Sequence, residues 1–204
     1  MISISCGAGK TQFVKKLLYN WNDLFEIKCH QIIFFYVKWQ DVYTELKVRF
    51  GSNIIFVQGL PEGFVEKYFS NTLYHKVIVF DDQMNNVTKS QECENLFLTS
   101  RHYNMSILYL THNIFNKLQR TIFLNCQFLV IFKNNNDAKQ ISYLAQRLYG
   151  HITGGAKKFL KYYNKSTSIA FGYLICDLRP HTEAHLRLLT DIFNSYPTVF
   201  PPII

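Results

Sequence analysis

Short apolar runs alternate with amphipathic stretches along this chain, and the alternation predicts strands separated by helices. Nearly continuous apolar runs, which are typical of strands buried on both faces, occur at residues 29–38, 53–57, 76–82, 106–111, 127–132 and 169–177. Apolar residues at helical spacing predict helices at residues 12–19, 41–50, 64–69, 91–103, 138–149 and 156–163. Strands that alternate with helices indicate an α/β fold with a mostly parallel sheet and helices on both of its faces.

The two ends of the chain are less regular. Residues 183–194 fit a helix or a strand, and we expect an irregular tail from about residue 195 to residue 204, which contains three prolines. Only residues 1–5 precede the first predicted loop, so we expect the N-terminal strand of the sheet to be truncated. No internal repeat and no linker interrupts the sequence, which predicts a single domain over residues 1–204.

Composition narrows the class of protein. A hydrophobic fraction of 48% and an aromatic fraction of 16% argue against disorder. The net charge of +8 suits a polyanionic partner such as DNA, although a basic surface that keeps the protein soluble explains it equally well. The five cysteines form no C-x-x-C pair, which indicates a reducing, intracellular compartment without disulfides or a zinc site. Because no apolar run approaches the ~18 residues of a membrane span, we expect no membrane partner.

The stretch Cys6-Gly7-Ala8-Gly9-Lys10-Thr11 has the form of the working end of a phosphate-binding loop. Its glycines permit the backbone torsions and the close approach that phosphates require. Lys10 would reach the terminal phosphates as a mobile charge, and Thr11 would place its hydroxyl on Mg²⁺. The helix that follows adds the positive end of its dipole. We therefore expect a nucleotide at residues 6–12, which are Cys6, Gly7, Ala8, Gly9, Lys10, Thr11 and Gln12.

One position departs from the full loop motif. The complete pattern has a glycine five residues before Gly9, where this chain has Ile4. A glycine-rich helix entry that binds no ligand is therefore the alternative interpretation of this stretch.

Two carboxylates, Asp81 and Asp82, end the apolar run that starts at Lys76. In open α/β sheets, ligands bind at the carboxyl ends of the strands. Asp81 fits a Mg²⁺-binding role, and Asp82 fits a general base that orients an attacking water. A solvated turn is the alternative, but the upstream Lys10 and Thr11 supply the other half of a magnesium–nucleotide site. The residues alone predict a magnesium-dependent nucleotide hydrolase or kinase.

His112 follows the apolar run at residues 106–111. A polar side chain at the carboxyl end of this strand could sense a terminal phosphate. It could equally cap the helix that we expect to begin near Ile114.

Several stretches together resemble the FtsK–HerA class of DNA-pumping ATPases, and more narrowly the genome-packaging ATPases of Polinton-like and adintovirus-like DNA viruses. They cover nearly the whole chain in family order, and the segment from Arg101 to Gly150 is the most specific. The matching stretches are GAGKTQFVKKLL, FFYVKWQDVYTELK, IIFVQGLPE, VIVFDDQM, RHYNMSILYLTHNIF, RTIFLNCQFLVIFKNNNDAKQISYLAQRLYG and FGYLICDLRP.

This resemblance implies a RecA-like P-loop ATPase core that uses ATP and Mg²⁺. It also implies a ring, a hexamer in this family, around double-stranded DNA, and pumping of that DNA into a viral capsid at an assembly site in the host nucleus or cytoplasm. Lys10 and Thr11 match the phosphate and magnesium positions, and Asp81 and Asp82 match the acidic pair. His112 stands where the family usually has a glutamine sensor.

Arg120 matches a basic position at the subunit edge, which makes it the candidate arginine finger. A surface salt bridge is the alternative for this residue, and Arg101 is a second candidate finger. Lys157, Lys161 and the residues around Arg101 are the expected DNA contacts.

Three functions stay open from the sequence. The first is an ATP-driven translocase of double-stranded DNA, the function that the resemblance implies. The second is a non-catalytic remnant of such an ATPase, which would bind nucleotide or DNA weakly. The third is a small P-loop kinase, which the loop permits but for which the sequence offers no separate arginine-rich lid.

Overall fold

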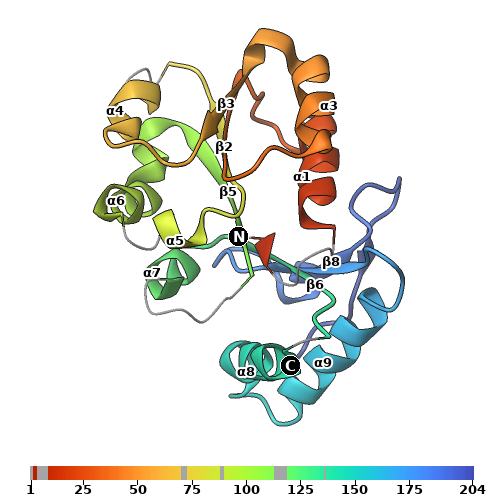
Figure 1. Ribbon diagram of the computed structural model, residues 1–204. Coiled ribbons are helices and arrows are strands. Elements are labelled where there is room, and N and C mark those ends of the chain that lie inside the picture. The colour runs from red at the N-terminus through yellow and green to blue at the C-terminus, as the bar shows by residue number, and fades with distance from the viewer. Residues whose placement is uncertain (1, 4–8, 70–72, 88–89, 113–118, 136) are drawn as a thin grey trace. The chain divides into compact units, whose positions relative to one another are not determined.

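A computed structural model describes residues 2–3, 9–69, 73–87, 90–112, 119–135 and 137–204 (Figure 1). The chain divides into two compact units. The parallel-sheet unit comprises Thr11–Thr111 and Lys117–Asn125, and the C-terminal unit comprises Met1–Lys10, His112–Asn116 and Cys126–Ile204. The expectation of a single ATPase domain over residues 1–204 stays a prediction.

A sheet of four parallel strands forms the centre of the parallel-sheet unit. Its order is β3-β2-β4-β5, and each neighbouring pair runs parallel. β4 is buried along its whole length, as its apolar sequence requires. The strands are β2 (Gln31–Tyr36), β3 (Ile54–Gln58), β4 (Lys76–Phe80) and β5 (Met105–Thr111).

Helices cover both faces of this sheet. In Figure 1, α1 and α3 lie on one side of the strands, and α4 and α6 lie on the other. The reason is visible in β2, where consecutive side chains point to opposite faces. The Phe34 ring lies 4.9 Å from the Tyr43 ring of α3, and the Phe35 ring lies 5.3 Å from the Phe64 ring of α4. The helical segments are α1 (Lys10–Tyr19), α2 (Trp21–Leu24), α3 (Asp41–Phe50), η1 (Gly51–Asn53), α4 (Phe64–Phe69), α5 (Met84–Val87), α6 (Gln91–Thr99), η2 (Ser100–Tyr103) and α7 (Gln119–Leu124).

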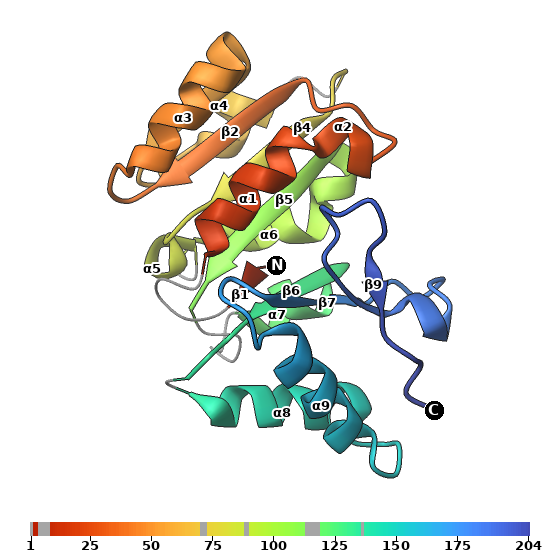
Figure 2. The same ribbon diagram turned by 90° about the vertical axis from the view of Figure 1, so that its right-hand side faces the viewer.

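The C-terminal unit has a mixed sheet and a pair of long helices. β1 (Ile2–Ser3) pairs in parallel with β6 (Phe128–Phe132), whereas β7 (Tyr173–Asp177), β8 (Leu188–Thr190) and β9 (Thr198–Val199) continue the sheet in antiparallel fashion. Between β6 and β7 the chain forms α8 (Ala138–Tyr149), α9 (Gly155–Ser166), and the short loop that joins them. Figure 2 shows these two helices side by side. A short 3-10 segment, η3 (Ala184–Leu186), precedes β8.

The antiparallel strands correct the expectation of a mostly parallel sheet for this part of the chain. One helix between two strands returns the chain to its starting edge and makes the strands parallel. A second helix adds one more reversal of chain direction, so β7, which follows both α8 and α9, runs against β6.

Three smaller expectations also change. The strand predicted over residues 169–177 begins only at Tyr173, because Phe171 adopts a left-handed conformation with φ 62°, which a regular strand does not accommodate. The undecided residues 183–194 contain η3 and β8, and the tail expected to be irregular contributes β9. The helix expected near Ile114 lies outside the described residues.

The α/β class and the parallel sheet flanked by helices are confirmed, and the P-loop ATPase identity of this core stays a prediction. Within the part of the chain that the structure describes, no helix combines the length and the apolar character that a membrane crossing requires.

Candidate functional site

Asp81 stands at the carboxyl end of β4, the central strand that the sequence singled out. Its backbone N–H donates a 2.9 Å hydrogen bond to the carbonyl oxygen of Phe35, which continues the pairing of β4 with β2 by one residue. The residue is almost completely buried. The acid is therefore held by the sheet itself and does not belong to a solvated turn.

Two hydroxyl groups donate to the carboxylate of Asp81. Thr11 Oγ1, from α1, lies 3.1 Å from Asp81 Oδ2, and the Tyr43 hydroxyl, from α3, lies 2.9 Å from the same oxygen. All three residues belong to the parallel-sheet unit. The structure thus brings together Thr11 and Asp81, the two residues that the sequence assigned to Mg²⁺.

Tyr43 was not singled out from the sequence. Burial raises the pKa of its hydroxyl, and the negative charges of Asp81 and Asp82 raise that pKa further. The hydroxyl therefore stays protonated and serves as a donor. The available signal was a tyrosine on the apolar face of a predicted helix, because a buried tyrosine hydroxyl usually requires a polar partner.

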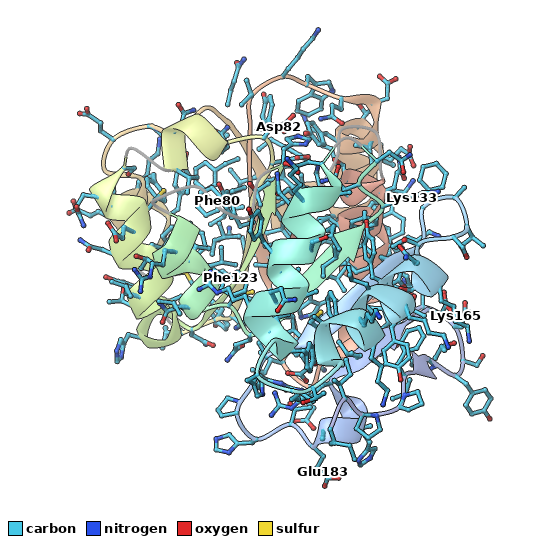
Figure 3. All side chains as sticks on the ribbon, turned by 90° about the horizontal axis from the view of Figure 1, so that it is seen from below. Phe80, Asp82, Phe123, Lys133, Lys165 and Glu183 are labelled. Atoms are coloured by element: carbon cyan, nitrogen blue, oxygen red, sulfur yellow. The ribbon has the colours of Figure 1, made fainter. Side chains whose placement is uncertain are left out.

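The second acid, Asp82, is labelled in Figure 3 and, unlike the buried Asp81, is exposed. It has φ 56°, a conformation that is uncommon outside glycine and that often marks functional sites. An exposed carboxylate one residue beyond a buried one can take up a proton from solvent or from a bound water. This placement is compatible with the general-base role expected for Asp82.

Gln83, the next residue, is a second feature that the sequence did not reveal. Its side chain is 0% exposed, and its Oε1 accepts a 2.7 Å hydrogen bond from Asn86 Nδ2. Its Nε2 has no hydrogen-bond partner within the described residues. If the O and N atoms of the Gln83 and Asn86 amides were exchanged, Gln83 Oε1 would be the unpaired atom instead. In either orientation, one polar atom of the buried Gln83 amide therefore has no hydrogen-bond partner within the described residues. Such atoms are rare and call for an explanation.

The phosphate-loop residues are described only in part. Ile4, Cys6, Gly7 and Ala8 lie outside the described residues. Gly9 has φ 91°, a torsion that favours glycine, and a Cβ at this position would lie 2.7 Å from Phe171 Cδ1. The backbone conformation therefore favours a glycine before the lysine, and a Cβ there would also require the Phe171 ring to shift.

Lys10, the first residue of α1, contacts His112 within the C-terminal unit. The lysine is 7% exposed, and its Nζ lies 3.0 Å from Nδ1 of His112. Because an ammonium group can only donate, the imidazole nitrogen in this contact must carry a free lone pair. The structure therefore joins the predicted phosphate lysine and the predicted sensor in one interaction.

The remaining predicted residues lie on the surface or outside the described part. Gln12 is exposed on α1, and Arg120 is exposed on α7. The side chain of Arg101 lies outside the described part. The finger role of Arg120 stays a prediction.

The donor set at Asp81 fits Mg²⁺. Within the described residues no group of three or more histidine, cysteine, aspartate or glutamate side chains is placed to hold a metal ion. Mg²⁺ does not require one, since it keeps several waters and binds through one or two protein oxygens plus substrate phosphates. Thr11 Oγ1 and Asp81 Oδ2 supply such a pair of oxygens.

Comparison with known proteins adds no relative. No protein family matches the sequence, and no curated protein matches it significantly.

Proposed function

We propose that this chain is a Mg²⁺-dependent ATPase that moves double-stranded DNA, of the viral genome-packaging type. The single observation that carries the ATPase part is the 3.1 Å hydrogen bond from the Thr11 hydroxyl to the Asp81 carboxylate. These residues come from the start of the first helix and from the end of a central parallel strand, where nucleotide sites in α/β folds are built. A structural turn would not require a threonine directly after Gly9 and Lys10.

In this proposal each residue near the acid has a separate task. Thr11 and Asp81 hold Mg²⁺, which when bound neutralises charge on the phosphate oxygens. The Tyr43 hydroxyl and the backbone bond to Phe35 fix the orientation of the Asp81 carboxylate. Asp82 accepts the proton of the attacking water.

The phosphate-loop side of the proposal uses the residues from Cys6 to Gln12. Their backbone N–H groups cradle the phosphates, and Lys10 supplies a positive charge to the terminal ones. His112 donates to a phosphate once Lys10 has moved from it to the ligand. Arg120 acts as the arginine finger in the nucleotide site of a neighbouring subunit.

The DNA part rests on the basic balance of the chain and on the resemblance to genome-packaging ATPases. A homo-oligomeric ring around double-stranded DNA, a viral capsid as partner and an intracellular assembly site are parts of the same proposal. Binding of this kind through phosphates weakens steeply with salt.

ATP hydrolysis in the Lys10→Ala variant tests the proposal. We expect Mg²⁺-dependent hydrolysis that double-stranded DNA stimulates, and a loss of about 100-fold or more in Lys10→Ala, because a charge aimed at the reacting phosphates is removed. Lys16→Ala is the matched control, since Lys16 is exposed on the same helix. Equal activity in wild type and Lys10→Ala would rule out the assignment of the site.

A non-catalytic subunit is the second candidate function. It is favoured by the contact between Lys10 and His112, which gives the lysine ammonium a hydrogen-bond partner inside the chain in place of a phosphate. Such a subunit would bind ATP weakly and would not turn it over. Calorimetric titration with ATP and Mg²⁺ separates the two, because tight binding followed by turnover excludes the non-catalytic subunit.

A further inference from the structure

The positive charge of this chain is concentrated in one pair of helices. The C-terminal unit contains ten lysines and arginines against four acids, which gives it +6 of the total +8. Six of these cations lie in α8 and α9, and the sequence has no aspartate or glutamate from Ala138 to Cys176. We call α8 and α9 together the basic hairpin. A charge imbalance this local is not what general solubility requires, because solubility is served by charges spread over the surface.

On α9, three of the four lysines are exposed. Lys157, Lys161 and Lys165 are exposed and follow each other at four-residue intervals. At 1.5 Å per residue they span about 12 Å, over which one DNA strand presents about three phosphates.

On α8 the exposed positions repeat with the same interval. Lys139, Tyr143 and Arg147 are exposed, and His151 continues the series just after the helix. An aromatic side chain between cations is typical of surfaces that contact nucleic acid. Both helices of the basic hairpin therefore present cations to solvent.

The apolar faces of the hairpin are already used inside the unit. Phe159 packs against Tyr149, with ring centroids 5.6 Å apart, and Tyr162 stacks on Phe200 at 4.8 Å. The Tyr163 hydroxyl donates to the Phe132 carbonyl and accepts from the Asn134 N–H. A helix that binds a membrane surface needs a free apolar face, and α9 has buried its own.

Each of the four acids of the unit has a partner other than the exposed lysines. Asp137 caps α8 by accepting from Gln140, and Asp177 pairs with Arg179. Glu183 contacts His185, and Asp191 accepts from Thr198. Among the cations, the half-buried Lys158 has a structural role, because its Nζ donates to the Pro202 carbonyl.

We propose that the basic hairpin binds the phosphate backbone of double-stranded DNA without sequence preference, through Lys157, Lys161 and Lys165 on α9 and Lys139 and Arg147 on α8. The polyanion-binding surface follows from the charges and their exposure, and the choice of a DNA duplex rests on the proposed function.

Binding of the full chain to a labelled duplex of about 20 base pairs tests the inference, with ATP absent. The hairpin variant is Lys157→Glu/Lys161→Glu, and the matched control is Lys28→Glu/Lys47→Glu, which changes the net charge equally at exposed positions of the parallel-sheet unit. We expect the hairpin variant to bind about tenfold or more weakly at ~50 mM salt, with a salt slope reduced by about two. The control should change affinity by less than about threefold.

Three results of the duplex titration would overturn the inference: no binding by the wild type, equal weakening in both variants, or unchanged binding in the hairpin variant. Preference for vesicles rich in phosphatidylserine over the duplex would also overturn it, because a membrane would then be the partner.

ATP hydrolysis separates this inference from the proposed function. If hydrolysis is absent but binding maps to the hairpin, the ATPase fails and the surface stands. If the hairpin variant hydrolyses ATP with undiminished DNA stimulation, the surface fails and the ATPase stands.

Discussion

Tyr43 fixes the buried carboxylate of Asp81, and its hydroxyl can be removed without removing the ring. In Tyr43→Phe the ring keeps its place beside Phe34, but Asp81 loses the 2.9 Å hydrogen bond. A hydrogen bond to a charged group contributes about 1.5–3 kcal/mol, so we expect a loss of that size in the free energy of unfolding. Urea denaturation measures it. Tyr196→Phe is the control, since Tyr196 is 88% exposed, and a Tyr43→Phe variant as stable as this control would contradict the role.

Replacing Gly9 would cost energy in two ways, through the backbone torsion and through the contact with Phe171. Comparison with Gly154, which has only the torsional cost, separates the two contributions. In Gly9→Ala the new Cβ meets Phe171 and the backbone stays at φ 91°, whereas Gly154→Ala meets only the torsional cost, because nothing lies within 4 Å of its Cβ position. We expect about 1–3 kcal/mol of destabilisation from the torsion in both variants.

The additional cost in Gly9→Ala should be small, because Phe171 is 67% exposed and its ring can move aside. Adding Phe171→Ala should therefore recover only that additional part, measured by thermal unfolding. Full recovery in the double variant would show that the torsion is not the main cost.

At the scale of residues, the sequence predicted partners better than it predicted their surroundings. Thr11 and Asp81 were expected in one site from a loop motif and from the end of an apolar strand, and the structure places their side chains in contact. Tyr43 and Gln83 were missed because their roles depend on burial. The Tyr43 hydroxyl meets Asp81 only in the folded arrangement of α3 and β4, and only the fold buries the amide of Gln83.

At the scale of elements, apolar runs located the strands of the parallel sheet to within a few residues. The helices at residues 41–50 and 64–69 were predicted with their bounds. The parallel direction expected for β7 was wrong. The direction of a strand depends on the number of helices between it and its neighbour, and not on the pattern of residues within the strand. The late start of β7 was also missed, because the left-handed conformation at Phe171 has no signature in a non-glycine residue.

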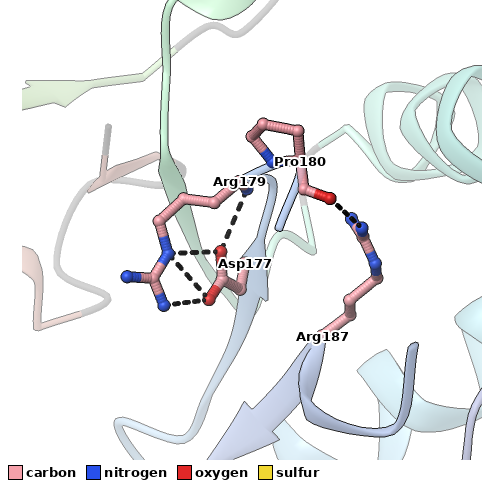
Figure 4. Close-up of polar contacts among 4 residues, drawn as sticks. All are labelled: Asp177, Arg179, Pro180 and Arg187. Carbon is pink, nitrogen blue, oxygen red and sulfur yellow. Dashed lines mark hydrogen bonds and ion pairs between the residues drawn. The ribbon is translucent and has the colours of Figure 1, made fainter. Parts of the chain in front are cut away.

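The end of β7 is anchored by an ion pair whose contribution depends on pH (Figure 4). Asp177 is 4% exposed, and Arg179 donates to it through Nε and Nη2. Burial alone would raise the pKa of this carboxyl, but the hydrogen bonds from Arg179 outweigh burial and lower it. A depressed pKa stabilises the fold above the unfolded value of about 3.9, and this contribution is lost as the pH falls through the folded pKa.

Arg179→Met should therefore destabilise the protein in a pH-dependent way. At about pH 7 we expect the free energy of unfolding to fall by about 1–3 kcal/mol, because the buried Asp177 carboxylate loses its partner. Solvent around the half-exposed arginine keeps the effect within this range. At about pH 3.5 the loss should shrink, since Asp177 in the variant is then protonated and no longer needs a cation. Arg187→Met is the matched control: Arg187 donates to the neutral carbonyl of Pro180, so its effect should not vary with pH. A constant Arg179→Met effect across this pH range, measured by urea denaturation, would contradict the assignment.

At the scale of the whole molecule, the buried acid of the candidate site and most of the net positive charge belong to different parts of the chain. The parallel-sheet unit carries the acidic end of β4, whereas the C-terminal unit carries most of the net positive charge. Composition alone gave the total of +8 but could not show that one helical hairpin holds the excess. That assignment needs the positions and the exposure of the lysines on α8 and α9.

Ligand binding should stabilise the folded chain as a whole, and the magnesium part of this effect should depend on Thr11. A ligand at 100 times its dissociation constant adds about 2.7 kcal/mol, which for a chain of this size raises the unfolding midpoint by about 5–10 °C. We expect ATP with Mg²⁺ to shift the midpoint further than ATP with a chelator in the wild type. In Thr11→Val the two shifts should become equal, because the hydroxyl that would hold the ion beside Asp81 is gone. Thr44→Val, at an exposed threonine of α3, should keep the difference. If the magnesium-dependent part of the shift survives in Thr11→Val, Thr11 is not a ligand of the metal.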